Sequence, residues 1–555
     1  MLLGLDVGGT FTDAVIIEGH RVIASAKART TKDNLMDGIG AVLDAVLQSL
    51  RTHAAKTGEA DNLTKSIEQV TLSTTVVTNT IVEHKEAPVD LYVITGPGMN
   101  VDYSFPVQPQ YIKGYTDHRG IVVETSVADI SANRHKHNLA AVSAKFGVRN
   151  PQEELSVANQ LKSYYDVIST GSSLSGSLNF PRRTISAYFN SAVTPVFTSF
   201  KTSVEEALRK RNITAPLYIL KADGGSLPIA HMKSRPVETV FTGPAATVLG
   251  LYALKAVGDS HTVALDIGGT TTDISLWKQG CPLMTKNGVS IREYPSAVRS
   301  FAVTSVGIGG ESAVRIEDGV LTVGPERVGP SAALGGETPT LGDALIVLGF
   351  ARYGDMKLAE ESIRALDSSC PVEELAQKII HTALQTIQCG IEDVVAAENK
   401  RPVYVVADIV NPDVFKPAQL VVVGGTASSL GESIGTYLKL SVTIPDNAAV
   451  ANAIGAAVAL STIEITVHVD TKRRMLVVPE LGIKESNCTL RRGDDVVHYA
   501  TSLLCAEADR LGLNHHQDVE VISMEDFPVV EGWQSLERLI TVKVQLEAGV
   551  KHHVE

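Results

Sequence analysis

The sequence contains few cysteines, and those present lie far apart. Its 555 residues include only Cys281, Cys370, Cys389, Cys488 and Cys505, with no C-x-x-C pair. This spacing excludes the usual cysteine-based zinc sites. A chain without a disulfide framework is typical of a reducing compartment.

The chain also lacks an excess of positive charge and any long apolar run. It has 49 Lys and Arg against 62 Asp and Glu, a net charge of −13. That balance argues against nucleic acid as the main partner, because a phosphate backbone requires a basic surface. No apolar stretch reaches the ~18 residues of a membrane span, and no charged leader precedes the first apolar run. We expect a soluble cytoplasmic protein that binds neither nucleic acid nor membrane.

One ten-residue pattern occurs twice. "GLDVGGTFTD" covers residues 4–13 and "ALDIGGTTTD" covers residues 264–273, with seven identical positions. In each copy a strand-like run ends at an Asp, a Gly-Gly-Thr turn follows, and a second apolar run begins. Such a pair of runs predicts a β-hairpin. Two hairpins, each at the apparent start of a domain, favour a phosphate site to which both contribute.

The residue types in the two hairpins suit a nucleotide. Glycines let backbone N–H groups approach an anion closely, and threonine hydroxyls at alternate positions can donate to phosphate oxygens. An Asp at a strand end can hold Mg²⁺, which contacts one or two carboxylates and keeps several waters. The residues predicted to hold ATP phosphates are Gly8, Gly9, Thr10, Thr12, Gly268, Gly269, Thr270 and Thr272. Asp6 and Asp266 are predicted to hold Mg²⁺ and to be catalytic, with Asp266 also orienting the attacking oxygen.

Two glycine-rich segments complete the predicted nucleotide site. "QLVVVGGT" at residues 419–426 is a buried-strand run that ends at Gly424, Gly425 and Thr426, where a flat base can lie against bare backbone. An ordinary strand-to-helix packing turn is the alternative. In "GIGGES", at residues 307–312, Gly309 and Gly310 are predicted to lie beneath the nucleotide. Glu311 is a candidate metal or substrate contact.

Two further motifs are candidates for the substrate side. "STTVVTNT" at residues 73–80 is dense in hydroxyls, so Thr74, Thr75 and Asn79 suit a polar pocket wall; ordinary helix capping is the alternative. Asp223 in "ADGGS" follows a strand-like run and is expected to face the cleft. Asp-Gly-Gly is also a plain turn signal.

These motifs resemble the hydantoinase/oxoprolinase A-subunit family of the actin-like ATPase superfamily, over about residues 1–460. The resemblance rests on "LDVGGTFTDAVI" at Leu5, "TLSTTVVTNTIVE" at Thr71, "LYILKADGGSL" at Leu217, "RPVETVFTGPAA" at Arg235, "LDIGGTTTDISL" at Leu265, "VGIGGES" at Val306, "TPTLGDALIVLG" at Thr338 and "VVVGGTAS" at Val421. The chain departs from the family pattern at Leu72-Ser73, Ala222 and Glu311. These departures bear on the substrate rather than on ATP.

The resemblance implies ATP hydrolysis coupled to opening of a cyclic amide or imide, as in 5-oxoprolinase. It also implies ATP and Mg²⁺ as cofactors, a B-type partner subunit, and an oligomer. Two alternatives stay open: a small-molecule kinase of the same superfamily, and a nucleotide-switched reactivating protein.

The expected fold is α/β, with duplicated actin-like (ribonuclease H-like) lobes. Residues 1–75 form the first lobe, 76–245 an α/β insertion on the substrate side, and 246–461 the second lobe. Residues 462–555 form a small α+β domain, since Ile463, Ile465, Val467 and Val469 alternate with polar residues as in a half-buried strand.

Overall fold

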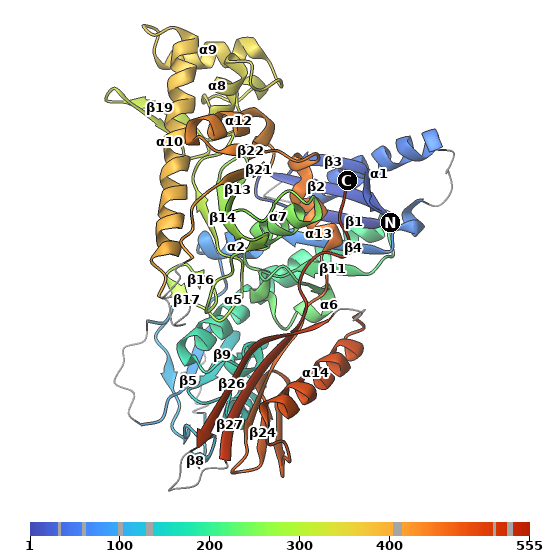
Figure 1. Cartoon of the computed structure of the whole chain (residues 1–555), viewed down its shortest axis with the longest axis vertical. Coiled ribbons are helices and arrows are strands. Elements are labelled where there is room, and N and C mark those ends of the chain that lie inside the picture. Colours follow the sequence, from blue (N-terminus) through green and yellow to red (C-terminus); the bar gives the residue numbers. More distant parts are fainter. Residues whose placement is uncertain are drawn as a thin grey trace.

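The computed structural model describes residues 1–30, 35–57, 63–97, 104–128, 137–402, 413–513, 518–529 and 537–555. The molecule is elongated: two sheets and their helices form the upper part, and the C-terminal sheet forms the lower end (Figure 1). The chain ends both lie in the upper part, where the Glu555 N–H donates to the His20 carbonyl at 2.7 Å. None of the helices described has the length and apolar character that crossing a bilayer requires.

The first lobe is built on a six-stranded sheet in the order β12-β11-β4-β1-β2-β3. Its strands are β1 (Leu2–Val7), β2 (Phe11–Glu18), β3 (Arg21–Arg29), β4 (Gln69–Thr74), β11 (Leu217–Leu220) and β12 (Ser226–Pro228). Helix α1 (Leu35–Thr57) packs on β2 and β3. It buries Ile39, Val42, Leu43, Val46, Leu47 and Leu50, whose spacing places them on one face of the helix.

The second lobe repeats this arrangement. Its sheet order is β15-β14-β13-β21-β22, with β18 also paired to β14. The strands are β13 (Thr262–Ile267), β14 (Thr272–Lys278), β15 (Cys281–Pro282), β18 (Val303–Val306), β21 (Gln419–Val423) and β22 (Ser441–Thr443). In each lobe the first strand pairs antiparallel with the second and parallel with the next along the order. The fold is therefore α/β with duplicated actin-like lobes, as expected.

Helices cover the second sheet on the side away from the first lobe (Figure 1). They are α8 (Leu341–Val347), α9 (Met356–Leu366), α10 (Val372–Asn399) and α12 (Ala427–Leu438), with the hairpin β19 (Val314–Glu317)–β20 (Val320–Val323) beside them. Thr340 caps α8 in a capping box with Asp343. Asp343 thus stabilises the start of α8 from inside its first turn.

Two helices of small residues lie between the lobes. A Cβ atom built on Gly455 of α13 (Ala451–Val458) would lie 2.0 Å from the Ala246 carbonyl oxygen of α7 (Thr242–Ala253). One built on Gly4 of β1 would lie 2.0 Å from the Ala453 carbonyl oxygen. The alanine-rich run of α13 therefore packs tightly against both α7 and β1. The Thr242 hydroxyl at the start of α7 donates to Thr74 O at 2.7 Å and so joins α7 to the end of β4.

The insertion contains its own four-stranded sheet, ordered β10-β9-β5-β6. It comprises β5 (Asp90–Ile94), β6 (Gln110–Tyr111), β9 (Leu139–Ala144) and β10 (Val167–Thr170), with α2 (Val76–Val82), α3 (Gln152–Leu161), α4 (Gly171–Leu174), α5 (Phe180–Arg209) and α6 (Ile229–Met232). A small hairpin, β7 (Tyr115–Thr116) and β8 (Val122–Glu124), lies at the lower end of the molecule near β26 and β27 (Figure 1). A second small hairpin is β16 (Ser290–Ile291) with β17 (Tyr294–Pro295).

The C-terminal segment forms a five-stranded sheet ordered β25-β24-β23-β27-β26, with α14 (Gly493–Arg510) packed on it. The strands are β23 (Glu464–Asp470), β24 (Met475–Val478), β25 (Ile483–Ser486), β26 (Val519–Val529) and β27 (Glu537–Leu546). Strand β23 is buried on both faces, contrary to the half-buried strand predicted, because Thr466 and His468 face the insertion and are also buried. The chain then returns to the lobes, where Val554 packs with Val15 and Ile17.

Candidate functional site

The turns of the two hairpins face one cavity between the lobes, of about 480 Å³. We call it the interlobe cavity. Residues from both lobes and from α7 and α13 line it: Asp6, Gly8, Gly9, Thr10, Phe11, Asp13, Lys27, Thr75, Gly243, Pro244, Asp266, Gly268, Gly269, Thr270, Thr271, Asp273, Gly310, Glu311, Ser331, Leu334, Tyr353, Gly424, Gly425, Thr426, Ala449 and Asn452. Most of the residues predicted from the sequence are therefore brought together.

The two turns have the same backbone geometry. The Gly8 N–H donates to Phe11 O at 3.1 Å, and the Gly268 N–H donates to Thr271 O at 2.9 Å. A Cβ atom built on Gly269 would lie only 3.3 Å from Thr10 Cγ2, so the turns approach each other across the cavity.

The next amides of each turn have no acceptor. The N–H groups of Gly9, Thr10, Gly269 and Thr270 donate no hydrogen bond to any residue that the structure describes. Four backbone donors therefore remain for a ligand, and clusters of such groups form anion-binding concavities.

Each hairpin contributes two carboxylates to the cavity, because Asp6 pairs in register with Asp13 and Asp266 with Asp273. The pKa of Asp6 is raised to about 6, mainly by burial and also by the charges of Asp13 and Asp266, while the hydrogen bond from Ser73 opposes the shift. Burial, and then the charge of Asp266, raises the pKa of Asp273 to about 7. Burial also raises the pKa of Asp13, although Lys27 opposes the shift. The cavity thus concentrates negative charge that a cation would stabilise.

Asn452 of α13 joins the two lobes at this point. Its Nδ2 lies 3.4 Å from Asp6 Oδ2 and 3.1 Å from Asp266 Oδ2. Thr247 of α7 also donates to Asp266 Oδ2, at 2.6 Å, and Ser73 donates to Asp6 Oδ1 at 2.5 Å. The small-residue helices therefore place their few polar side chains on the paired carboxylates.

The donor set suits Mg²⁺ rather than a metal held entirely by protein. In the described part of the chain, no group of three or more His, Cys, Asp or Glu side chains is placed to hold a metal ion. Mg²⁺ needs only one or two carboxylates and otherwise keeps its waters. Asp6 and Asp266, whose Oδ2 atoms share Asn452, meet that requirement.

Three predicted cofactor residues do not line the cavity. The Thr12 hydroxyl lies 3.0 Å from Thr30 Oγ1, and the Thr272 hydroxyl donates to Ile308 O at 2.7 Å. Side chains alternate along a strand, so a strand that turns Asp13 or Asp273 toward the cavity turns the preceding Thr away. Gly309 packs behind the second turn, where a Cβ atom would lie 2.5 Å from Thr270 N.

The late strand β21 ends at the cavity as predicted. Gly424 has φ +95°, and a Cβ atom there would lie 2.4 Å from Asp266 Oδ1, so only glycine fits without displacement. Gly425 has open space where its Cβ would be. Leu334 and Tyr353 line the same cavity and provide apolar surface.

Only some of the candidate substrate residues line the interlobe cavity. Thr75 lines the interlobe cavity, and Asn79 donates to its hydroxyl at 3.2 Å. Thr74 is buried outside the cavity lining, and its hydroxyl accepts from the Val76 N–H at 3.2 Å, one residue before the N-cap of α2. Glu311 lines the cavity and pairs with Arg327 at 2.6 Å; its Oε1 lies 3.9 Å from Arg29 of the first lobe.

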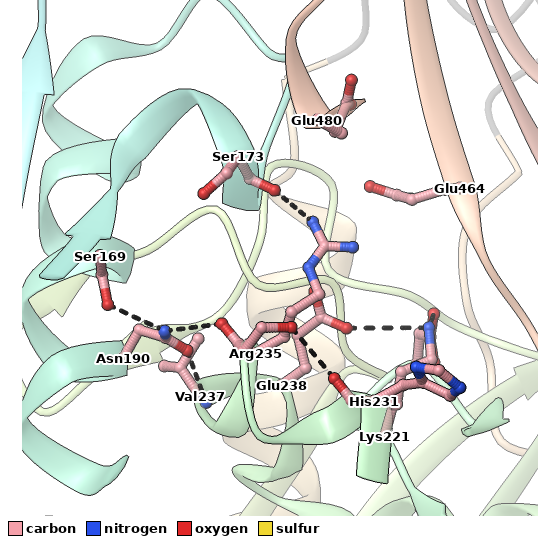
Figure 2. Close-up of polar contacts among 12 residues, drawn as sticks. Ser169, Ser173, Asn190, Lys221, His231, Arg235, Val237, Glu238, Glu464 and Glu480 are labelled. Atoms are coloured by element: carbon pink, nitrogen blue, oxygen red, sulfur yellow. Dashed lines mark hydrogen bonds and ion pairs between the residues drawn. The ribbon is translucent and has the colours of Figure 1, made fainter. Parts of the chain in front are cut away.

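Asp223 lies elsewhere, in a buried polar cluster between the insertion, the lobes and the C-terminal sheet. It pairs with Lys221 at 2.9 Å and accepts from the Gly225 N–H at 2.9 Å. Figure 2 shows this cluster, with Lys221, Arg235 and Glu238 near Glu464 and Glu480. Its cavity is about 30 Å³, room for about one water molecule. The expectation that Asp223 faces the cleft is therefore wrong, because the end of β11 is covered by these ion pairs.

Sequence reasoning did not assign Asp13, Asp273, Lys27 or Asn452 to the site. Asp13 and Asp273 are the last residues of the two copies of the repeated pattern, so the repeat could have identified them as site residues. Asn452 stands among alanines in the small-residue run, where a lone polar residue is a usable signal. Nothing in the sequence pairs Lys27 with Asp13, which it contacts at 2.6 Å from the next strand.

Comparisons with known proteins agree with this geometry. A sequence profile described as Hydantoinase/oxoprolinase matches residues 183–465, and one described as Hydantoinase/oxoprolinase N-terminal region matches residues 2–165. The chain is 26% identical over 417 residues to caprolactamase subunit alpha of Pseudomonas jessenii, covering 68% of this chain and 58% of that subunit. It is 24% identical over 469 residues to the acetophenone carboxylase gamma subunit of Aromatoleum aromaticum, covering 72% and 61%. The chain thus spans about three fifths of these relatives' length.

Two solved structures have a similar fold. Nucleotide-free acetone carboxylase matches with a TM-score of 0.69 and 17% identity, over 99% of this chain and 88% of that one. The ATP-dependent caprolactamase from Pseudomonas jessenii matches with a TM-score of 0.68 and 20% identity, over 98% and 87%. At these identities the likeness is one of fold. The two profiles together cover most of residues 2–465, so the chain belongs to the hydantoinase/oxoprolinase family.

Proposed function

We propose that the chain binds Mg-ATP in the interlobe cavity and phosphorylates the oxygen of a cyclic amide or imide to drive ring opening. The observation that carries this proposal is the pair of facing turns with four unused backbone N–H groups, above two paired sets of carboxylates. A phosphate chain carries negative charge on all sides. Donors on one side alone would leave half of that charge without a partner.

The roles follow from position. The backbone N–H groups of Gly9, Thr10, Gly269 and Thr270, with the hydroxyls of Thr10 and Thr270, bind the phosphates, and Gly8 and Gly268 shape the two turns. Gly310, Gly424, Gly425 and Thr426 line the nucleoside end. Asp6 and Asp266 hold Mg²⁺ through water, and the ion supplies charge neutralisation for phosphoryl transfer. Asp266, fixed by Thr247 and Asn452, is oriented to position the attacking oxygen.

The proposed reaction is balanced as follows. The ring carbonyl oxygen attacks the γ-phosphorus, the bond to the β,γ-bridging oxygen breaks, and ADP leaves. Water adds to the ring carbon of the phosphorylated imidate, the ring nitrogen leaves with a proton, and an acyl phosphate remains. A second water releases phosphate and the carboxylate. One amide bond and one phosphoanhydride are thus hydrolysed by two waters.

The proposal also assigns residues to the substrate and a partner subunit to the chain. Thr75, Asn79 and Glu311 lie at or next to the cavity, where a ring can approach the γ-phosphate. The curated relatives are named as subunits, which supports a B-type partner subunit and an oligomeric assembly for this chain.

The test measures phosphate release with ATP and a panel of rings: 5-oxoproline, hydantoin and caprolactam, with and without co-purified partner protein. Phosphate and ring-opened product in equal amounts support the proposal. A stable phosphorylated product would instead identify a kinase. Nucleotide-dependent complex formation with no turnover of any ring would identify a switched partner protein.

A further inference from the structure

A second cavity, of about 220 Å³, lies at the end of the molecule away from the interlobe cavity, and the two share no residue. It is enclosed by the β7–β8 hairpin, the loop after β9, and the C-terminal sheet. Its lining residues are His118, Arg119, Arg149, His468, Asp470, Lys472, Arg473, Met475, Val477, Val529 and Leu539. We call it the distal cavity. The strands around it, β8, β24, β26 and β27, lie together at the lower end of Figure 1.

Hydrogen bonds between the three parts hold the distal cavity in shape. Arg473 Nη1 of the C-terminal sheet donates to Arg119 O of the hairpin at 3.1 Å. Asn150 Nδ2 donates to Gly120 O at 3.0 Å and so joins the hairpin to the loop after β9. His468 Nε2 donates to Gly176 O at 2.9 Å and joins β23 to the insertion. The walls are therefore preformed, which lowers the cost of ordering them around a ligand.

The distal cavity carries an excess of positive charge. Arg119, Arg149, Lys472 and Arg473 line it, against a single carboxylate, Asp470. Arg473 already uses that carboxylate, through its backbone N–H at 3.1 Å and its Nε at 3.7 Å. His468 is neutral at physiological pH, because burial, and then the charge of Arg149, lowers its pKa to about 3.

Arg149 is a half-buried cation that has no partner among the described residues. Its guanidinium makes no hydrogen bond and no ion pair with any residue that the structure describes. Burial lowers its pKa, while the more distant charges of Glu525 and Asp470 raise it. Removing a charge from water without a partner is costly. An anion in the cavity would offset that cost, and a guanidinium matches the planar geometry of a carboxylate.

The C-terminal sheet also contributes apolar residues to the lining, namely Met475, Val477, Val529 and Leu539. Met475 and Val477 lie directly across from Asp470 and His468 on the neighbouring strand. The cavity is smaller than the roughly 300–1,000 Å³ of sites for drug-sized ligands, which excludes a nucleotide and leaves room for a short carbon chain.

We propose that the distal cavity binds a small organic carboxylate, with the carboxylate on Arg149 and its apolar body against Met475 and Val477. This site is separate from the proposed ATP site and does not depend on it. Phosphate is also an anion but has no apolar part. Comparing its binding with that of an organic carboxylate therefore tests whether the apolar residues of the cavity contribute.

Isothermal titration calorimetry with hexanoate tests the proposal on the full chain. A saturating non-hydrolysable ATP analogue with Mg²⁺ is included so that the interlobe cavity is filled. Wild type is expected to bind hexanoate with a dissociation constant of about 1 mM or tighter. Arg149→Gln should weaken binding about tenfold or more, the scale of one lost charge-assisted contact. Hexan-1-ol should not bind, and inorganic phosphate should bind more weakly than hexanoate.

The matched control is Arg474→Gln, which removes an equal charge from an exposed position in the turn between β23 and β24, outside the lining of the cavity, and should leave binding unchanged. Arg119→Gln, also exposed, gives a second variant at the cavity mouth and should weaken binding about threefold. Equal hexanoate affinity in wild type and Arg149→Gln, or no binding by wild type, would overturn the site. Tighter binding of phosphate than of hexanoate would overturn the organic carboxylate.

Discussion

At the scale of single residues, Asn452 links the carboxylates of the two lobes, because its amide reaches both Asp6 and Asp266. Asp6 and Asp266 occupy the same position in the two copies of the ten-residue pattern and equivalent positions at the ends of β1 and β13. Their shared partner brings them to the same part of the interlobe cavity.

Asp6→Asn and Asp266→Asn are each expected to reduce ATPase activity by roughly 10²-fold or more, the scale of losing one preorganised electrostatic contact. Asparagine keeps the side-chain shape, so both variants should fold. Steady-state phosphate release measures the effect. Asp37→Asn, at an exposed position on α1, is the control and should behave as wild type. Full turnover in both site variants would contradict the proposed roles.

Asp273 predicts a pH dependence of stability. Its pKa is raised to about 7 in the folded chain, so the folded state binds the proton more tightly than the unfolded state. Its contribution to stability is therefore greatest at low pH and is lost as pH rises toward 8. Between pH 5 and pH 8, without nucleotide or Mg²⁺, the free energy of unfolding of wild type should fall relative to Asp273→Asn by roughly 1–3 kcal/mol.

Urea unfolding of both proteins at the two pH values measures that difference. Asparagine retains an acceptor for the Ser305 hydroxyl, which donates to Asp273. A difference between the two proteins that does not change with pH would show that Asp273 does not titrate in this window.

At the scale of elements, the lobes are joined through backbone contact between α7, α13 and β1. Gly455→Ala would place a methyl group 2.0 Å from the Ala246 carbonyl oxygen, so we expect a large loss of stability, about 2 kcal/mol or more. Gly258→Ala, just after α7, has nothing within 4 Å of the added Cβ and should cost little. Thermal unfolding compares the two. Equal melting temperatures would contradict this packing.

The same elements show what the sequence could predict. The repeat of residues 4–13 at 264–273 was sufficient for both hairpins and for the carboxylates at their strand ends, since local patterns determine local structure. The positions of Thr12 and Thr272 were predicted wrongly, because Thr10 and Thr270 lie in the turns before β2 and β14, so strand alternation does not extend from them to Thr12 and Thr272. The position of Asp223 was predicted wrongly, because Thr462 and Glu464, which help to enclose it, come from a distant part of the chain. The burial of both faces of β23 likewise depends on packing against the insertion, and the local sequence of β23 cannot predict that contact.

At the scale of the whole molecule, the chain end secures the C-terminal sheet to the lobes. The Lys551 N–H donates to Val458 O at 2.7 Å, and Val554 packs on Val15 and Ile17. Val554→Asp should therefore lower the melting temperature of the whole chain, because it buries a charge in that cluster. His552→Ala is a milder change in the same segment. An unaltered melting temperature in Val554→Asp would show that the chain end adds no stability.

The central claim is that both Gly-Gly-Thr turns bind one nucleotide, and amide hydrogen exchange tests it most directly. The N–H groups of Gly9, Thr10, Gly269 and Thr270 donate no hydrogen bond to any described residue, so they should exchange fast in the free protein. A non-hydrolysable ATP analogue with Mg²⁺ is predicted to slow exchange in both turns, with the same midpoint concentration. Protection of only one turn, or two different midpoints, would contradict a single nucleotide shared between the lobes.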